Sequence, residues 1–153
     1  MNKPVWLIYL LSLLLIISCG TPSGNDDGAK LDRRERIKLK QYINEGKKLY
    51  RVHCANCHQE DGSGLARLYP PLKNSDYLNA GVDRIICQIK NGAEGEMVVN
   101  GITFNMPMPE KPDLTHLEIA EVSTYIFNEW GKHKGLISTE RVAETLKTCD
   151  SEP

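Results

Sequence analysis

Apolar residues recur at the spacing of an amphipathic helix in three long segments of this chain. The segments run from Leu31 to about Arg51, from Val82 to Asn91 and from Asp113 to Trp130. Their apolar stripes are formed by Leu39, Ile43, Leu49 and Tyr50, by Val82, Ile85, Ile86 and Ile89, and by Ile119, Val122, Ile126 and Trp130. A shorter stripe of Val142, Leu146 and Cys149 predicts a last helix, which must pack on the others because it is too short to be stable alone. The pattern predicts a small all-α domain.

Local signals refine this helical picture. Thr115 and Glu118 have the spacing of a capping box, which places the start of the third helix. Asn100-Gly101 lies between apolar pairs, so residues 96–104 are expected to form a short β-hairpin, with a loop as the alternative. Gly46 lies inside the first helix, where glycine costs about 1 kcal/mol relative to alanine. We therefore expect another helix to pass close to Gly46, with an aromatic residue lying across it.

The start of the chain has a different pattern. Lys3 is followed by an uncharged apolar run from Val5 to Ile17, which has the length of a signal-peptide core and is short for a membrane span. The run ends in Ile-Ile-Ser-Cys-Gly, which resembles a bacterial lipobox. Residues 1–18 are therefore predicted to be a lipoprotein signal peptide, and Cys19 is predicted to carry the lipid. An ordinary export signal or an uncleaved anchor is the alternative.

The remaining organisation follows from composition. A Gly/Ser/Pro/Asp-rich stretch predicts a flexible tether over residues 19–34. The folded domain is expected over residues 35–135, and residues 136–153 form a C-terminal extension that packs on it. The chain has 153 residues and a formal net charge of −1, which suits one domain and gives no indication of a nucleic-acid partner. Basic residues of the first helix form either a docking patch for an acidic redox partner or a solvated helix face: Lys38, Lys40, Lys47, Lys48 and Arg51.

Residues 54–58 carry the clearest chemistry in the chain. Their sequence, Cys-Ala-Asn-Cys-His, is the C-x-x-C-H pattern of covalent c-type haem attachment. Cys54 and Cys57, on one helical turn, can each form a thioether bond with a vinyl group of the porphyrin. His58 then lies beneath the iron and can coordinate it through an imidazole nitrogen. A zinc site or a redox dithiol is the alternative, but a zinc site needs a second ligand pair and a thioredoxin-like dithiol needs a strand–helix context.

Three further groups are assigned from the chain around this motif. Met106 and Met108 both lie in a proline-stiffened loop that could hold a thioether at the sixth position of the iron, and the residues alone do not choose between them. The carbonyl of Pro71 is our candidate acceptor for the second ring N–H of His58. Cys87 lies off its helix stripe and Cys149 points inward, so we predict that these two cysteines form a disulfide after export.

The chain resembles the class I, single-haem cytochrome c family over roughly residues 40–131. The resemblance is carried by the C-x-x-C-H motif, Gly46 with Tyr50, Pro70-Pro71-Leu72, Met108-Pro109, and the helix from Leu114 to Trp130. It implies a fold with crossed first and last helices around one covalent haem. It also implies Met108 as the axial ligand, with Met106 as the alternate, and supports Pro71 as the acceptor. The leader, the cysteine pair and the tail depart from the pattern and suggest a lipoprotein-like bacterial branch.

These observations predict a tethered carrier of single electrons that is not an enzyme. It would be exported, anchored by lipid to a bacterial membrane and face the periplasm, where it exchanges electrons with protein partners. One alternative is a haem subunit docked permanently in a respiratory or dehydrogenase complex. The other is a haem enzyme or gas sensor with an open sixth position, although no distal histidine or arginine is evident for peroxide activation.

Overall fold

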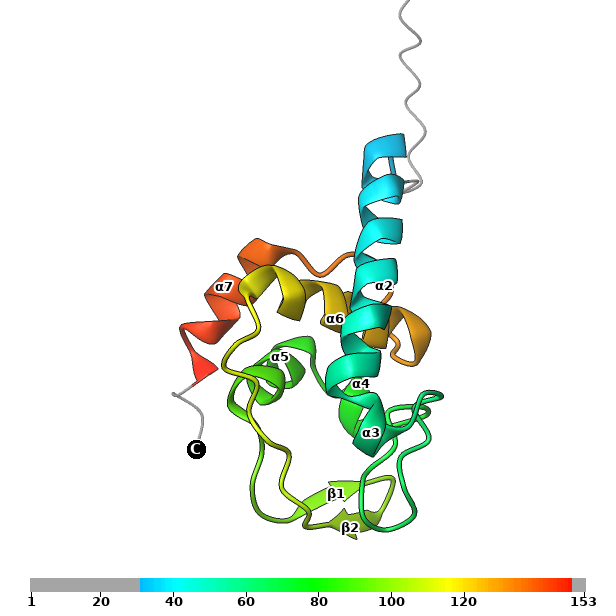
Figure 1. Cartoon of the computed structure of the whole chain (residues 1–153), viewed down its shortest axis with the longest axis vertical. Coiled ribbons are helices and arrows are strands. Elements are labelled where there is room, and N and C mark those ends of the chain that lie inside the picture. The colour runs from blue at the N-terminus through cyan, green and yellow to red at the C-terminus, as the bar shows by residue number, and fades with distance from the viewer. Residues whose placement is uncertain (1–30, 150–153) are drawn as a thin grey trace, which may run out of the picture. The chain divides into compact units, whose positions relative to one another are not determined.

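The computed structural model describes residues 31–149, and these form the body of the protein. The predicted signal peptide and Cys19 lie outside the described residues. The elements are α2 (Arg33–His53), α3 (Ala55–His58), α4 (Asp76–Asn79), α5 (Val82–Asn91), β1 (Met97–Val99), β2 (Ile102–Phe104), α6 (His116–Glu129) and α7 (Thr139–Leu146). The fold is mostly helical with one small antiparallel sheet, which confirms the predicted class (Figure 1).

The two longest helices, α2 and α6, cross and pack against each other (Figure 1). Gly46 lies at the crossing, where a Cβ atom would come within 2.8 Å of Cβ of Tyr125 and still closer to the backbone of Glu121. The ring of Tyr50 lies beside those of Tyr125 and Trp130, with centroids 5.5 and 5.1 Å away. The predicted close approach at Gly46, with an aromatic residue across it, is therefore confirmed.

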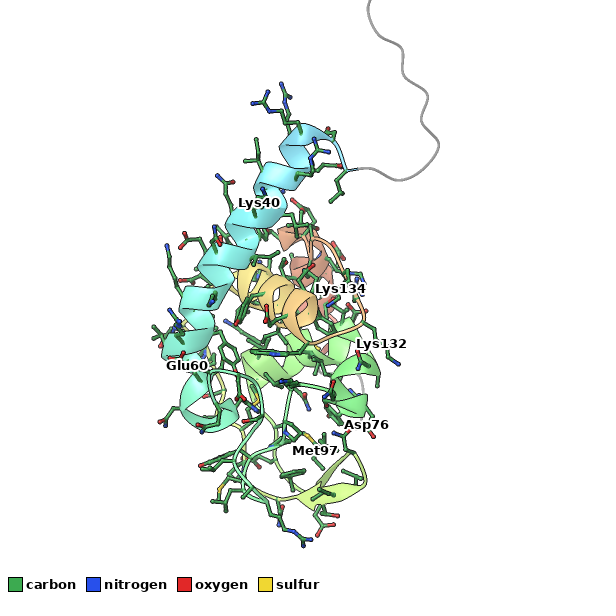
Figure 2. All side chains as sticks on the ribbon, turned by 90° about the vertical axis from the view of Figure 1, so that its right-hand side faces the viewer. Lys40, Glu60, Asp76, Met97, Lys132 and Lys134 are labelled. Atoms are coloured by element: carbon green, nitrogen blue, oxygen red, sulfur yellow. A yellow bond between two sulfur atoms is a disulfide. The ribbon has the colours of Figure 1, made fainter. Side chains whose placement is uncertain are left out.

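The predicted β-hairpin is present at residues 97–104. Val98 pairs with Thr103, and Asn100 with Gly101 makes the turn, both at positive φ. Asp76 and Asn100 exchange hydrogen bonds of 2.8 and 3.0 Å between side-chain oxygens and backbone N–H groups. This exchange ties the hairpin turn to α4, and Figure 2 shows Asp76 and Met97 together at that end of the body.

The C-terminal extension packs on the outside of α5 and α6. Val142 of α7 is fully buried, and Ser138 caps the helix by accepting a hydrogen bond from the N–H of Arg141. The structure contains a disulfide between Cys87 of α5 and Cys149, just after α7. Within residues 31–149, no helix combines the length and the apolar character needed to cross a membrane.

Candidate haem site

The C-x-x-C-H sequence lies at the corner where α2 ends and α3 begins. The N–H of Cys54 donates to the carbonyl of Tyr50, which continues α2, and the N–H of His58 donates to the carbonyl of Cys54, which closes α3. Cys54 and Cys57 are half-buried free thiols on this single turn. Because burial dominates, the pKa of Cys54 rises to about 11, so the thiol of the folded chain is protonated at neutral pH. The turn presents the two thiols and the imidazole together.

The ring of His58 is held by the carbonyl of Pro70, which accepts a hydrogen bond of 2.9 Å from Nδ1. The prediction of Pro71 as the acceptor is therefore wrong by one residue. The carbonyl that faces the ring is set by how the loop passes over His58. Pro71 instead lies in the wall of the pocket beside the motif.

The bond to Pro70 leaves Nε2 of His58 as the nitrogen available to a metal. Burial lowers the pKa of His58, and the backbone hydrogen bond to Pro70 partly offsets that shift. The result favours the neutral imidazole, which is the form that coordinates a metal ion. A hydrogen bond from the far ring nitrogen also fixes the tautomer and the ring orientation.

A single pocket contains the motif and both methionines. Its empty space, counted out into the open mouth, is about 970 Å³. No Asp, Glu, Lys or Arg is among the described residues that line it. Its apolar wall includes Leu78, Ile85, Ile89, Val99, Phe104 and Ile126. The space is suited to a large apolar ring system attached at one edge by Cys54 and Cys57.

Met106 and Met108 differ in how firmly the structure holds them. The N–H and the carbonyl of Met108 both pair with Ala93, at 2.8 and 2.9 Å, and its side chain packs against the core. Met106 is 45% exposed, although it also lines the pocket. The residue with the fixed backbone and the partly buried side chain is Met108.

Two polar residues of the pocket were not found from the sequence. The side-chain amide of Gln88 donates to the hydroxyl of Tyr77 at 2.6 Å, and both residues line the pocket. The guanidinium of Arg84 stacks on the ring of Tyr77 at 3.8 Å and donates to its backbone carbonyl. Tyr77 belongs to α4, which is only four residues long and therefore carries no helical periodicity in the sequence.

Comparison with known proteins gives this geometry a family. The family model described as Cytochrome c matches residues 43–130, which is more than half of the chain. The chain belongs to the cytochrome c family. Cytochrome c-552 of Thermus thermophilus is 33% identical over 94 residues, covering 59% of this chain and 71% of the relative. A second cytochrome c-552, from another strain of the same organism, is equally similar and is matched over 63% of its length.

A more distant match is a cytochrome subunit of a larger enzyme. The cytochrome c subunit of the quinone alcohol dehydrogenase of Gluconobacter oxydans is 25% identical over 107 residues. The match covers 69% of this chain but only 22% of that subunit. The family and these relatives identify the protein as a class I c-type cytochrome that carries covalently bound haem c and its iron and transfers electrons.

Cys54 and Cys57 are positioned as this family requires for thioether attachment of the haem. The apolar, uncharged pocket and the imidazole held by Pro70 fit the same group. The haem supplies an iron that changes oxidation state by one electron, while the protein chain supplies its ligands, its orientation and its surroundings.

Proposed function

We propose that this cytochrome is a membrane-tethered carrier of single electrons, with its iron held by His58 and Met108. The observation that carries the proposal is that the motif at residues 54–58 and Met108 line one uncharged pocket from separate segments of the chain. With both axial positions filled, no position would remain for a substrate. The protein would then pass electrons between redox partners without being an enzyme itself.

The ligand assignment is supported by how the two side chains are held. Nδ1 of His58 is bonded to Pro70, so Nε2 is available to the iron. Met108 is fixed by two backbone hydrogen bonds to Ala93 and is partly buried against the core, whereas Met106 is 45% exposed. A thioether ligand opposite histidine raises the reduction potential, and burial of the haem in an uncharged pocket affects the potential as well.

Optical spectra of the haem-loaded protein test this assignment. Oxidised wild type should show the methionine–iron charge-transfer band, Met108→Ala should lose it, and Met106→Ala should keep it. A band that survives in Met108→Ala overturns the assignment of the ligand. Wild-type protein that lacks the band and binds carbon monoxide readily when reduced has an open sixth position, which would favour an enzyme or a gas sensor.

The tether is a proposal from the sequence. Residues 1–18 would be removed as a signal peptide, lipidated Cys19 would anchor the chain, and residues 19–34 would link it to the domain at 35–135. One acyl chain binds a membrane only reversibly, so stable anchoring needs more than one. Wild type should therefore fractionate with membranes and carry a multiply acylated Cys19 by mass spectrometry. Membrane association that persists in Cys19→Ser, without acylation in wild type, would contradict the lipid anchor.

A permanently docked subunit is the second candidate, and the match to a dehydrogenase cytochrome subunit supports it. The two arrangements differ in their response to salt, because contacts between exposed charges are screened within about 10 Å at 0.1 M ionic strength. Extraction in mild detergent followed by native mass spectrometry at low and high salt separates them. A partner that remains bound at high salt identifies a subunit, whereas a monomeric cytochrome identifies a mobile carrier.

A further inference from the structure

We propose that the C-terminal end of α5 positions Met108 as an iron ligand and that the C-terminal extension holds α5 in place from its other side. This inference rests on the proposed coordination by Met108. It assigns a positioning role to Gly92 and Ala93, to Asp83, and to the Cys87–Cys149 disulfide. None of these residues is itself proposed to touch the iron.

The methionine segment is attached directly to the end of α5. Met108 and Ala93 exchange two backbone hydrogen bonds, at 2.8 and 2.9 Å. Two residues of the same segments add further contacts, since the N–H of Lys111 donates to the carbonyl of Lys90 and the ammonium of Lys90 donates to the carbonyl of Pro112 at 2.7 Å. The path of residues 108–112 is therefore set by residues 90–93.

Gly92 is the point at which the two segments come closest. Its φ is +77°, a conformation that side chains other than glycine rarely adopt. A Cβ atom at Gly92 would lie 2.5 Å from the carbonyl oxygen of Met108 and 2.8 Å from the backbone nitrogen of Glu110. Because the obstructing atoms are backbone, a side chain at Gly92 would push the methionine segment away rather than rotate a flexible neighbour.

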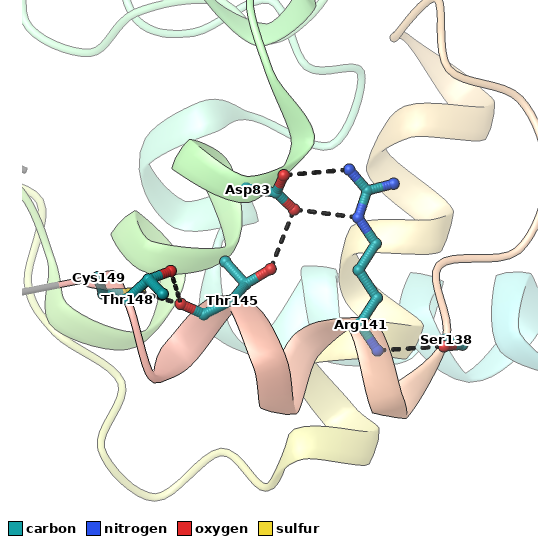
Figure 3. A network of polar contacts seen from close by, with 6 residues as sticks. All are labelled: Asp83, Ser138, Arg141, Thr145, Thr148 and Cys149. Atoms are coloured by element: carbon teal, nitrogen blue, oxygen red, sulfur yellow. Dashed lines mark hydrogen bonds and ion pairs between the residues drawn. The ribbon is translucent and has the colours of Figure 1, made fainter. Parts of the chain in front are cut away.

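The other side of α5 is fastened to the extension. Asp83 in its first turn accepts hydrogen bonds from Arg141 at 3.0 and 3.3 Å and from the hydroxyl of Thr145 at 3.0 Å (Figure 3). One turn further along α5, Cys87 is joined to Cys149. An ionic contact and a covalent bond thus tie successive turns of α5 to α7 and to the segment just after it.

These attachments lie on the side of α5 away from the haem pocket. Ile85 and Ile89 of the same helix line the pocket, whereas Asp83 and Cys87 do not. A displacement of α5 would therefore move a pocket wall and the partner of Met108 together. Fixing α5 from outside keeps the thioether near the position where it binds, so less ordering is needed for coordination.

Competition by imidazole measures how well the methionine is held. Added imidazole must displace the protein's own ligand to bind ferric haem, so its apparent affinity rises when that ligand is poorly positioned. The decisive comparison uses haem-loaded Gly92→Ala and Gly101→Ala. Gly101 also has a left-handed φ, +75°, but it does not line the haem pocket, and nothing lies within 4 Å of the place its Cβ would occupy.

We expect Gly92→Ala to bind imidazole about tenfold more tightly than wild type, and Gly101→Ala to stay within about twofold. Both variants place alanine at nearly the same left-handed φ, so they differ in the contact with the backbone of the methionine segment. Equal imidazole affinities in the two variants overturn the positioning role of Gly92. Wild type is first checked for the methionine–iron band, because its absence would refute the proposed ligand rather than this inference.

The extension is tested in the same assay with Asp83→Asn and with Cys87→Ser combined with Cys149→Ser. Both should raise the affinity for imidazole by several fold. Val122→Ala, which removes buried volume from α6 outside the pocket lining, is the control for general loss of stability. If Val122→Ala raises the affinity as much at a matched fall in Tm, or if neither α5 variant changes it, the proposed role of the extension is overturned.

Discussion

The backbone carbonyl of Glu121 in α6 lies where a side chain on Gly46 of α2 would have to stand. Gly46 therefore lies where α2 and α6 touch. Both helices contribute to the aromatic cluster, since Tyr50 comes from α2 and Tyr125 from α6. The crossing also fixes the end of α2, and Cys54 follows one turn after Tyr50. The position of the haem motif therefore depends on a contact made two turns earlier.

We expect Gly46→Ala to lower the free energy of unfolding by about 2 kcal/mol or more, because overpacking a tight contact costs about 1–3 kcal/mol and outweighs the gain in helix propensity. Urea denaturation of the haem-loaded protein measures the loss. Gly81→Ala is the matched control, since its φ is 171° and nothing lies within 4 Å of a Cβ there. A Gly46→Ala protein as stable as Gly81→Ala would show that α2 and α6 can separate slightly at no cost.

The capping boxes of α2 and α6 should differ in their effect on stability. In α6 the hydroxyl of Thr115 accepts from the N–H of Glu118 and the Glu118 carboxylate accepts from the N–H of Thr115. Because α6 is buried along most of its length, Thr115→Ala should cost about 1 kcal/mol of global stability. The loss of stability is measured from the midpoint of urea denaturation, with the dependence of the unfolding free energy on urea concentration unchanged from wild type.

Asp32→Ala is the matched control for this prediction. Asp32 and Glu35 form the same reciprocal pair, but every residue from 31 to 38 is exposed. That turn can fray without disturbing the core, so the global stability should change by less than about 0.3 kcal/mol while amide exchange at residues 33–38 accelerates. Equal losses in the two variants would mean that the first turn of α2 unfolds together with the body.

Much of the fold could be predicted because its helices carry long apolar stripes. The helix at Val82–Asn91 was predicted with the observed bounds, and the hairpin was found from Asn100-Gly101, where turn chemistry is local. The helix α4 was missed, since four residues capped by Ser75 give no periodic signal. Sequence patterns thus predicted the helices and the hairpin that are determined by their own residues.

The residues of the haem site also fall into those that local sequence predicts and those that depend on distant contacts. The C-x-x-C-H motif is local and could be identified from five adjacent residues. The choice between Pro70 and Pro71 depends on how a loop passes over the ring of His58, which no local pattern records. Met106 and Met108 are each followed by proline and look alike in sequence. Their environments differ through contacts with distant residues, namely the pairing of Met108 with Ala93, fifteen residues earlier, and the packing of Met108 against the core.

Asp83 should make the stability of the body depend on pH. The pKa of Asp83 is held below its usual value of 3.8, chiefly by hydrogen bonding to Arg141 and to a smaller extent by hydrogen bonding to Thr145. A carboxyl with a lowered folded-state pKa stabilises the fold fully above its unfolded pKa and loses that contribution as the pH falls through the folded value. The contribution of Asp83 to the free energy of unfolding is modest because its side chain is 61% exposed.

Urea denaturation of wild type and Asp83→Asn between pH 7 and pH 2.5 checks this dependence. The difference in the free energy of unfolding should stay constant down to about pH 4 and shrink below it. A difference that is unchanged at pH 2.5 would show that the contacts of Asp83 do not favour its ionised form.

The charge of this cytochrome is distributed unevenly, and we expect that distribution to govern reaction with anionic redox partners. Helix α2 carries eight Lys or Arg and two Glu, a formal charge of +6, so the rest of the chain carries −7 against the total of −1. Arg51 lies one turn before Cys54, and Lys47 one turn before that. An anionic oxidant approaching the haem at this corner should therefore be attracted at low ionic strength.

Stopped-flow oxidation of the reduced protein by hexacyanoferrate(III) tests this attraction. Lys47→Gln combined with Arg51→Gln should slow the reaction about two- to fivefold at low ionic strength, and the rates should converge at about 0.5 M salt. Lys132→Gln combined with Lys147→Gln removes the same charge elsewhere, and the two pairs match in that Arg51 and Lys147 each have an acidic partner. If both pairs slow the reaction equally, the rate follows net charge alone, and α2 has no special part in bringing an anionic partner to the haem.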